Sequence, residues 1–449
     1  MKKVVLSAAA VIGMAGVANA SSSSELAELK AQMAAMAKKI EMLESKQAKS
    51  DQKVEKITVA KESEKNDITI VNPDSPEFLL GKETDINMKF KAQDDPDMWL
   101  KAGIRLQGTF DNRQTDYVDP TKADQTLQDA FMRRVRFEIA AGFTKNTSFV
   151  MDVRNDKANY EDKGEEGFNV GDAYVKIDKP FDDSLVNFKL YRAKIDVSRT
   201  ETVKSAHTIC YDRPYVADEA AQFISENRRA ANAQMYGDWN KKVHYQLAFG
   251  DATASDHSKD AIGTSLNGSI KDANFFYGGK LILSPFDGWE ETDRTETYFG
   301  EGKHFALGVG YWKAPNIEYS TGDSTDHTLI NYELSAHYKN AFVQAEYFDF
   351  DGVVRKWASD ETGTSSGWYA TGEYVIPELS YIAPFVRYEK WDRWEDASGY
   401  DLTSKVAGIN WYLRGNTTKV GLVYQKDSYG EEIGNKDVTS TRVTTQWFF

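Results

Sequence analysis

The sequence predicts an all-β fold, a 16-stranded antiparallel transmembrane β-barrel with an N-terminal α-helical coiled coil. From residue 98 onward, polar and apolar residues alternate with the period of two that a β-strand requires. Short turns alternate with long, acidic, Gly/Ser-rich connections, as in membrane barrels that have turns on one side and loops on the other. The last ten residues, 440–449, place Val443, Thr445, Trp447 and Phe449 on one strand face, where they suit a lipid-facing wall.

Residues 1–20 have the pattern of a secretory signal peptide. Lys2 and Lys3 precede a short uncharged apolar run over residues 4–17, and Ala18-Asn19-Ala20 forms a small-residue cleavage site. The apolar run is too short to span a bilayer comfortably. We therefore expect cleavage after Ala20 and export of the mature chain.

Residues 21–58 are predicted to form a periplasmic coiled coil. Apolar residues recur at alternating spacings of three and four, which makes an a/d heptad seam. A lone amphipathic helix is the alternative, but such a narrow stripe buries too little surface to hold a helix in water. We therefore expect self-association through the seam. The predicted oligomerisation residues are Leu26, Leu29, Met33, Met36, Ile40, Leu43, Val54 and Ile57.

Residues 59–97 lose the heptad pattern. They are charged and contain three prolines, which predicts a linker with at most local structure. The barrel then occupies residues 98–449.

The alternating pattern predicts sixteen strands in the barrel. One connection, residues 285–303, should be a short turn by its place in the order but is long, so eighteen strands stay open. The predicted strands are 99–110, 129–143, 147–156, 168–178, 185–195, 232–239, 243–251, 274–284, 304–312, 327–338, 341–350, 366–375, 381–391, 401–413, 417–426 and 438–449.

Composition excludes several function classes. The chain is 12% aromatic although its mean hydropathy is -0.57, which suits a barrel with an apolar outside and a wet inside. The single cysteine, Cys210, excludes an intrachain disulfide framework, and a net charge of -14 argues against nucleic acid as a partner. No nucleophile elbow, phosphate loop or metal-ligand spacing is present, so we expect neither an enzyme nor a cofactor nor a metal.

Three segments carry a family resemblance: the run Asp129-Ala130-Phe131-Met132-Arg133-Arg134-Val135-Arg136-Phe137-Glu138, then Val170-Gly171-Asp172-Ala173-Tyr174-Val175, then residues 187–194. They resemble Gram-negative trimeric outer-membrane porins, and the order of segments is similar to the phosphate-selective (O and P type) porin family. The resemblance does not carry over phosphate specificity.

This resemblance implies a passive channel for small hydrophilic solutes, often anions, in the outer membrane of a Gram-negative bacterium. The implied partners are outer-membrane lipids, further copies of the chain in a homotrimer, and the barrel assembly machinery, which would recognise the aromatic C-terminal strand.

Arginine is concentrated in the first part of the barrel, with eleven of seventeen between positions 98 and 230. Alternation points four of them, on three strands, into the lumen, where a column of guanidinium groups would favour anions. Glu138, Asp152 and Asp172 face the same way and are able to neutralise the column, so a mixed, weakly selective pore is the alternative. The predicted pore-lining residues are Arg105, Arg134, Arg136, Arg154, Arg192, Lys194, Arg199, Arg213, Arg228 and Arg229.

Residues 196–231, after the fifth strand, form the longest connection. Long ordered loops tend to be functional, and the resemblance implies that this loop folds into the lumen and narrows it. Two short apolar stretches, 216–217 and 220–224, predict a helical turn packed on the wall; an ordinary exterior loop is the alternative.

The sequence thus predicts an outer-membrane porin with anion preference, whose coiled coil clamps the trimer. The alternative function is a general, weakly selective porin whose coiled coil serves mainly as a tether toward the cell wall and its peptidoglycan.

Overall fold

The computed structural model describes residues 68–71, 88–92, 95, 97–162, 167–225, 228–252, 270–291, 293–319, 324–355 and 358–448. The predicted signal peptide, the predicted coiled coil with its eight seam residues, most of the linker and Phe449 lie outside these residues.

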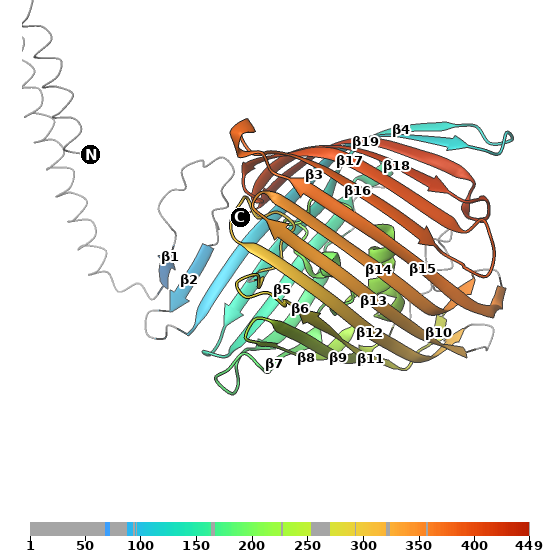
Figure 1. Cartoon of the computed structure of the whole chain (residues 1–449). Helices are drawn as coiled ribbons and strands as arrows, with labels where there is room; N and C mark the ends of the chain where they lie inside the picture. Colours follow the sequence, from blue (N-terminus) through green and yellow to red (C-terminus); the bar gives the residue numbers. More distant parts are fainter. Residues whose placement is uncertain are drawn as a thin grey trace, which may run out of the picture. The chain divides into compact units, whose positions relative to one another are not determined.

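The described residues form a closed antiparallel barrel of sixteen strands (Figure 1). Each strand pairs with the next in the chain, and the last pairs with the first from Phe448↔Arg105 to Lys436↔Tyr117. All sixteen predicted strands are confirmed, and the alternative of eighteen strands is wrong. The strands are β3 (Trp99–Tyr117), β4 (Gln125–Gly142), β5 (Thr147–Ala158), β6 (Asn169–Ile177), β7 (Asn187–Arg192), β8 (Ala231–Trp239), β9 (Val243–Asp251), β11 (Phe275–Leu283), β12 (Lys303–Tyr319), β13 (Ser324–Tyr338), β14 (Ala341–Arg355), β15 (Ala358–Tyr374), β16 (Ile382–Asp392), β17 (Asp401–Arg414), β18 (Thr418–Tyr429) and β19 (Lys436–Phe448).

Shorter elements decorate this wall. β10 (Ile270–Asp272) pairs with the outer end of β12, and β2 (Met88–Ala92) pairs with the start of β3 and with β1 (Ile68–Val71). The helices are α3 (Arg199–Thr202), α4 (Tyr215–Ile224) and the 3-10 turns η1 (Tyr160–Asp162), η3 (Pro377–Leu379) and η4 (Glu431–Ile433). No helix among the described residues is long and apolar enough to cross a bilayer.

The barrel is apolar outside and polar inside. Ile409, Leu422 and Val443 are register neighbours on β17, β18 and β19, and their side chains are exposed on the outer face. Asn410 and Gln446, which have the opposite strand parity, are buried inside. This distribution reverses that of a soluble protein and is the one expected of a barrel whose outer face meets lipid. This distribution explains how a sequence rich in aromatic residues has a polar mean hydropathy.

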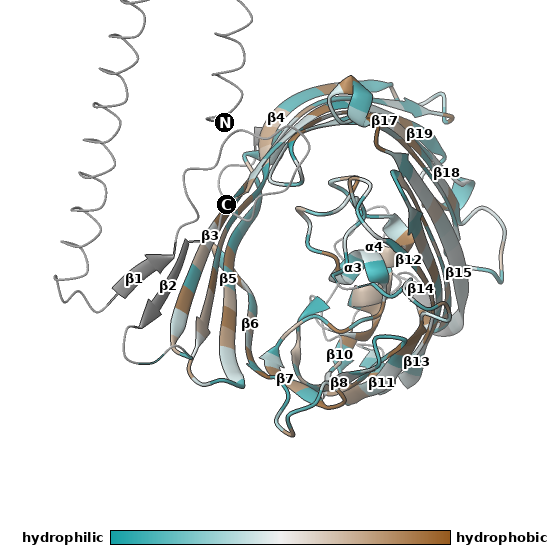
Figure 2. Ribbon diagram, turned by 60° about the vertical axis from the view of Figure 1, so that its left-hand side comes forward, coloured by the Kyte–Doolittle hydropathy of each residue, from teal (hydrophilic) through white to brown (hydrophobic). Residues whose placement is uncertain are grey.

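A hydrophobic core lies inside the barrel, on one side. Val216, Ala220 and Phe223 of α4 pack against inward-facing residues of β12 to β14, including Trp312 and Phe348. Figure 2 shows α3 and α4 inside the ring of strands, near β12 and β14. This core fills the part of the lumen next to β12–β15 and leaves the opposite wall to form the candidate site.

Candidate functional site: the barrel lumen

Residues 193–230, between β7 and β8, form a loop that folds into the lumen; we call it the constriction loop. Val197, Ser198 and Ala206 in this loop are fully buried. The loop contains α3 and α4, so both the inward course and the predicted helical turn are confirmed, and the exterior-loop alternative is wrong.

Helix α4 begins where it does because the wall caps it. Pro214 precedes the first turn, and the two carboxylate oxygens of Glu389 on β16 accept hydrogen bonds from the backbone N–H groups of Tyr215 and Val216, at 3.0 and 2.7 Å. An acidic group at this end satisfies free N–H donors and complements the helix dipole. The helix then presents its apolar stripe to the wall.

Polar side chains of the wall bind the constriction loop on several sides. Arg105 donates to Ser205 Oγ at 2.8 Å, and Lys419 donates to the carbonyl oxygen of Thr208 at 2.6 Å. The strands that carry these two residues, β3 and β18, are separated only by β19, so both contacts lie on one side of the barrel. Further wall residues bonded to it are Gln246 of β9, Glu346 of β14, Glu389 of β16 and Gln446 of β19.

The open part of the lumen runs along β3 to β7. Inward-facing carboxylate side chains on this wall keep contact with water: Glu138 is 29% exposed and Asp172 is 28% exposed. On the opposite wall, the inward-facing Glu346 and Glu389 are only 2% and 0% exposed. Among these carboxylates, the water-accessible ones therefore lie off-centre, between the constriction loop and the β3–β7 wall.

Three cavities lie on this side of the lumen, and the outer one extends from β3–β5 onto β18 and β19. An inner cavity of about 250 Å³ is lined by six basic and three acidic side chains, and an outer cavity of about 360 Å³ is lined by six basic and four acidic ones. A third cavity, of about 400 Å³, contains Arg154, Arg192 and Asp156. Basic groups are in excess in all three. The basic residues of the inner cavity are Arg105, Arg136, Lys189, Lys194, Lys204 and Arg229, and those of the outer cavity are Arg113, Arg133, Lys157, Arg213, Lys436 and Arg442.

Most of the predicted pore residues are paired with carboxylates. Arg105 pairs with Glu138 and Arg229 pairs with Asp172, the latter at 2.8 Å. Of the three acidic residues considered from the sequence, Glu138 thus pairs with an arginine of the column, and Asp172 pairs with a predicted pore residue outside the column.

Asp156 on β5 is the carboxylate partner of two more of the predicted pore arginines. It lies 2.7 Å from Arg136 and 4.0 Å from Arg154. Arg192 instead donates to the carbonyl oxygen of Gly171 at 2.8 Å.

The hydrogen-bond acceptors of Arg134 are amide and carbonyl oxygens, whereas the neighbouring arginines meet carboxylates. The Arg134 guanidinium donates to Gln107 Oε1 at 2.8 Å and, through two nitrogens, to the carbonyl oxygen of Tyr211 at 3.0 Å. Only 2% of Arg134 is exposed. The side chain therefore braces the constriction loop against β4.

Three basic side chains surround Glu201 in the constriction loop. The buried Glu201 carboxylate lies 2.8 Å from Lys194, 3.2 Å from Arg213 and 3.6 Å from Arg228. Burial raises the pKa of this carboxyl, but the positive charges of Arg213, Lys194 and Arg228 outweigh burial and hold the pKa well below its usual range. Three predicted pore residues thus converge on one anion that sequence reasoning did not single out.

Arg199, the remaining predicted pore residue, is buried away from the three cavities. It donates to Gln344 Oε1 of β14 at 2.7 Å and to the carbonyl oxygen of Thr295 at 2.8 Å.

Arg133 and Arg442 line the outer cavity but were not among the predicted pore residues, although alternation already places Arg442 opposite the lipid-facing Val443. Strict alternation points Arg133 outward, but the β3–β4 pairing skips it, with Gln107↔Arg134 followed by Gly108↔Met132. This bulge turns Arg133 inward, where it meets Asp212 at 2.8 Å. The adjacent pair Arg133-Arg134 was the available signal, because two neighbouring arginines on a lipid-facing strand cannot both face water without a bulge.

Asp212 links these two arginines to the constriction loop, since Arg442 lies 2.6 Å from its other oxygen. Burial raises the pKa of Asp212, but Arg133 and Arg442 outweigh burial and hold the pKa far below its usual range.

Comparisons with known proteins support the fold. No family model matches the chain. It is 25% identical to an uncharacterized protein of Aquifex aeolicus over 409 residues, which covers 83% of this chain and 92% of that protein.

Among solved structures, the chain is similar to an anion-selective porin from Comamonas acidovorans, with a TM-score of 0.52 and 11% identity over 78% of this chain and 99% of that one. It is also similar to the outer-membrane channel DcaP of Acinetobacter baumannii, with a TM-score of 0.51 and 9% identity over 80% and 99%. Identities this low show the fold alone, and the likeness to phosphate-selective porins stays a prediction. The chain therefore has the barrel fold of outer-membrane porins.

Proposed function

We propose that this protein is an outer-membrane porin, a passive channel for small hydrophilic solutes with a preference for anions. The observation that carries the proposal is the excess of basic side chains in the cavities along the β3–β7 wall, beside the constriction loop. Basic groups at a pore's narrow section lower the barrier for anions, and guanidinium groups match carboxylate and phosphate oxygens in shape.

The preference of the pore for anions over cations should be moderate. Paired charges such as Arg229–Asp172 and Arg136–Asp156 present little net charge to a passing ion. What remains is the surplus of basic over acidic groups in each cavity, and water in the pore screens this surplus.

Single-channel recording in planar bilayers tests the proposal. We expect discrete ion steps from purified protein, and a reversal potential in a salt gradient that has the sign of anion selectivity. Absence of ion steps would sink the channel proposal. A cation-selective reversal potential would refute the role given to the arginines, and one near zero would favour the weakly selective alternative.

The rest of the chain fits this proposal as follows. Residues 1–20 are a signal peptide removed after Ala20, and residues 21–58 form a three-helix periplasmic coiled coil that clamps a homotrimer. The aromatic C-terminal strand is recognised by the barrel assembly machinery. In support, the heptad seam needs partner helices, and Val443 and Trp447 lie exposed on the outer wall.

Deletion of residues 21–58 tests the clamp. We expect the trimer to dissociate at a lower temperature, measured by gel filtration after heating. Unchanged trimers would show that the coiled coil is a spacer or a tether rather than a clamp.

A further inference from the structure

A second loop also enters the lumen, from the opposite end of the barrel. Residues 284–302 connect β11 to β12, where the sequence order called for a short turn. We call this segment the buttress loop. Glu296 and Thr297 are 5% and 3% exposed, so the middle of the loop is buried inside the barrel.

Glu296 binds the constriction loop at two points. Its Oε1 accepts a hydrogen bond from Thr200 Oγ1 at 2.9 Å, and its Oε2 accepts one from the backbone N–H of Ile209 at 2.7 Å. Its own backbone N–H donates to the carbonyl oxygen of His207 at 3.0 Å. One residue therefore holds both ends of the segment that runs from α3 to Ile209.

Arginine side chains make further links between the two loops. Arg199 of the constriction loop donates to the carbonyl oxygen of Thr295 at 2.8 Å and to the Tyr298 hydroxyl at 3.1 Å. Arg294 of the buttress loop lies 2.7 Å from Asp196. These contacts are buried or partly buried, where charge-assisted hydrogen bonds are strongest.

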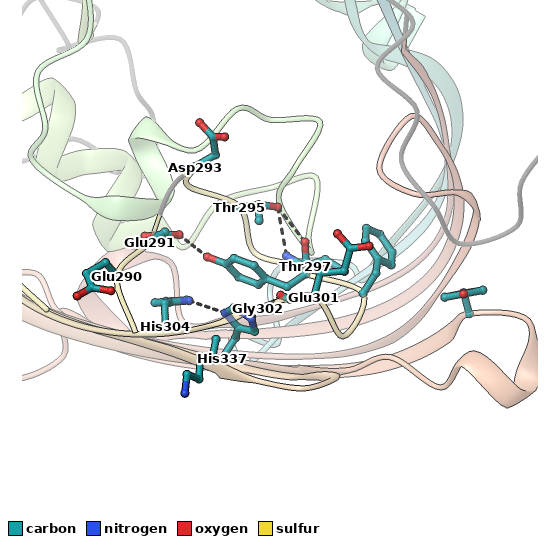
Figure 3. A pocket seen from close by; sticks show the side chains of 13 residues that line it. Glu290, Glu291, Asp293, Thr295, Thr297, Glu301, Gly302, His304 and His337 are labelled. Carbon is teal, nitrogen blue, oxygen red and sulfur yellow. Dashed lines mark hydrogen bonds between the residues drawn. The ribbon is translucent and has the colours of Figure 1, made fainter. Parts of the chain in front are cut away.

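The buttress loop is itself fixed to the wall. Thr297 Oγ1 donates to Glu373 of β15 at 2.5 Å, and Tyr298 stacks on His337 of β13 with ring centroids 3.7 Å apart. Figure 3 shows Glu291, Thr295, Thr297 and His337 gathered at this point. A continuous series of contacts therefore reaches from the wall to the constriction loop.

We propose that the buttress loop sets the width of the pore, with Glu296 as the positioning residue. This inference rests on the proposed function, because it concerns the same constriction. The part of the constriction loop between Ile195 and Tyr211 contains only the four-residue helix α3. A segment with so little internal structure keeps its position only through outside partners, and Glu296 supplies three of them.

The test compares Glu296→Ala with Asp293→Ala by single-channel conductance and by the swelling of liposomes in sugars of increasing size. Both changes remove one negative charge from the same loop, but Asp293 is exposed. We expect Glu296→Ala to raise conductance and admit larger sugars than the wild type, and Asp293→Ala to keep the wild-type exclusion limit. Circular dichroism before insertion confirms that each variant is folded.

Thr200→Val serves as a second variant if Glu296→Ala fails to fold. It removes a single hydrogen bond to Glu296, and we expect a smaller shift in the same direction. An exclusion limit that stays at the wild-type value in every folded variant, or that becomes smaller, overturns the inference while the channel stands. Absence of ion steps from the wild type would instead refute the proposed function.

Discussion

At the scale of single residues, the lumen is organised by charge pairs rather than by free arginines. Arg229 is an example of such a pair: it lines the inner cavity and lies 2.8 Å from Asp172. Strand alternation placed four arginines of β3, β4 and β5 inside the barrel, but it did not identify their partners, because partner choice depends on contacts between segments distant in sequence.

Arg229→Gln should shift the reversal potential toward cations. The change removes one basic group from the inner cavity and leaves the Asp172 carboxylate unpaired. Unit charges 4 Å apart interact by about 1 kcal/mol in water, so we expect the anion/cation permeability ratio to fall severalfold. Lys241→Gln, in an exposed turn, is the matched control and should leave the ratio unchanged. An equal shift in both variants would show that the inner cavity does not determine selectivity.

Glu201→Gln should destabilise the folded protein. The substitution leaves three cations, Lys194, Arg213 and Arg228, without their buried counter-ion. Removing one partner from a buried ion pair costs about 3–5 kcal/mol, which thermal unfolding followed by circular dichroism would measure. Glu378→Gln, an exposed residue on the β15–β16 turn, should unfold as the wild type does. A wild-type unfolding temperature for Glu201→Gln would contradict this account.

The contribution of Glu201 should also depend on pH. Because its folded pKa lies well below its usual range, the carboxylate stabilises the fold at pH values above the unfolded pKa, about 4.3. That contribution is lost as pH falls from there through the lower folded pKa. We expect the difference in unfolding temperature between wild type and Glu201→Gln to be constant near neutral pH and to narrow below about pH 4. A difference that narrows between pH 8 and pH 6 would point to another group.

At the scale of elements, helix α4 fixes the constriction loop to one wall. Phe223 stacks on His327 with ring centroids 4.2 Å apart and meets Phe350 edge-on at 5.3 Å. The sequence carried a signal for this packing, since Phe348 and Phe350 add apolar residues to the inward face of β14. A strand that is apolar on both faces needs an apolar partner inside the barrel, and α4 is that partner.

Phe223→Ala should loosen the constriction loop without preventing barrel closure. Removing a fully buried phenylalanine costs about 3–5 kcal/mol, and the cost falls on the packing of α4. We therefore expect noisier single-channel currents and a lower unfolding temperature. Phe181→Ala removes the same side chain from an exposed turn, where 69% of it is accessible, and serves as control. Identical currents in the two variants would show that α4 does not need this contact.

At the scale of the whole molecule, the barrel has an inverted distribution of polarity. Exposed apolar side chains cover its outer face, while amides, hydroxyls and charges line the interior outside the hydrophobic core around α4. The same inversion explains why the part of the constriction loop next to β3, β18 and β19 binds the wall through hydrogen bonds, because the inward faces of these strands offer mostly polar groups.

Leu422→Arg should impair folding into a bilayer. Leu422 lies on the outer face of β18, and an arginine near the bilayer midplane costs about 2–4 kcal/mol. Urea titration in lipid vesicles would measure the loss. Leu379→Arg places the same side chain at a similarly exposed site in the turn after β15, and should have little effect. Equal stability of the two variants would mean that the outer face of β18 does not meet lipid.

The sequence by itself determined the order of the strands, their number to within one pair, the side on which most strand residues lie, and the helical turn in the long connection after the fifth strand. These properties follow from local periodicity and from connection length, which need no knowledge of distant contacts. The tertiary structure decided the bulge that turns Arg133 inward, the convergence of three cations on Glu201, and the meeting of two loops from opposite ends of the barrel. Each of these joins residues far apart in the chain or breaks the regular period, and only the closed barrel brings them together.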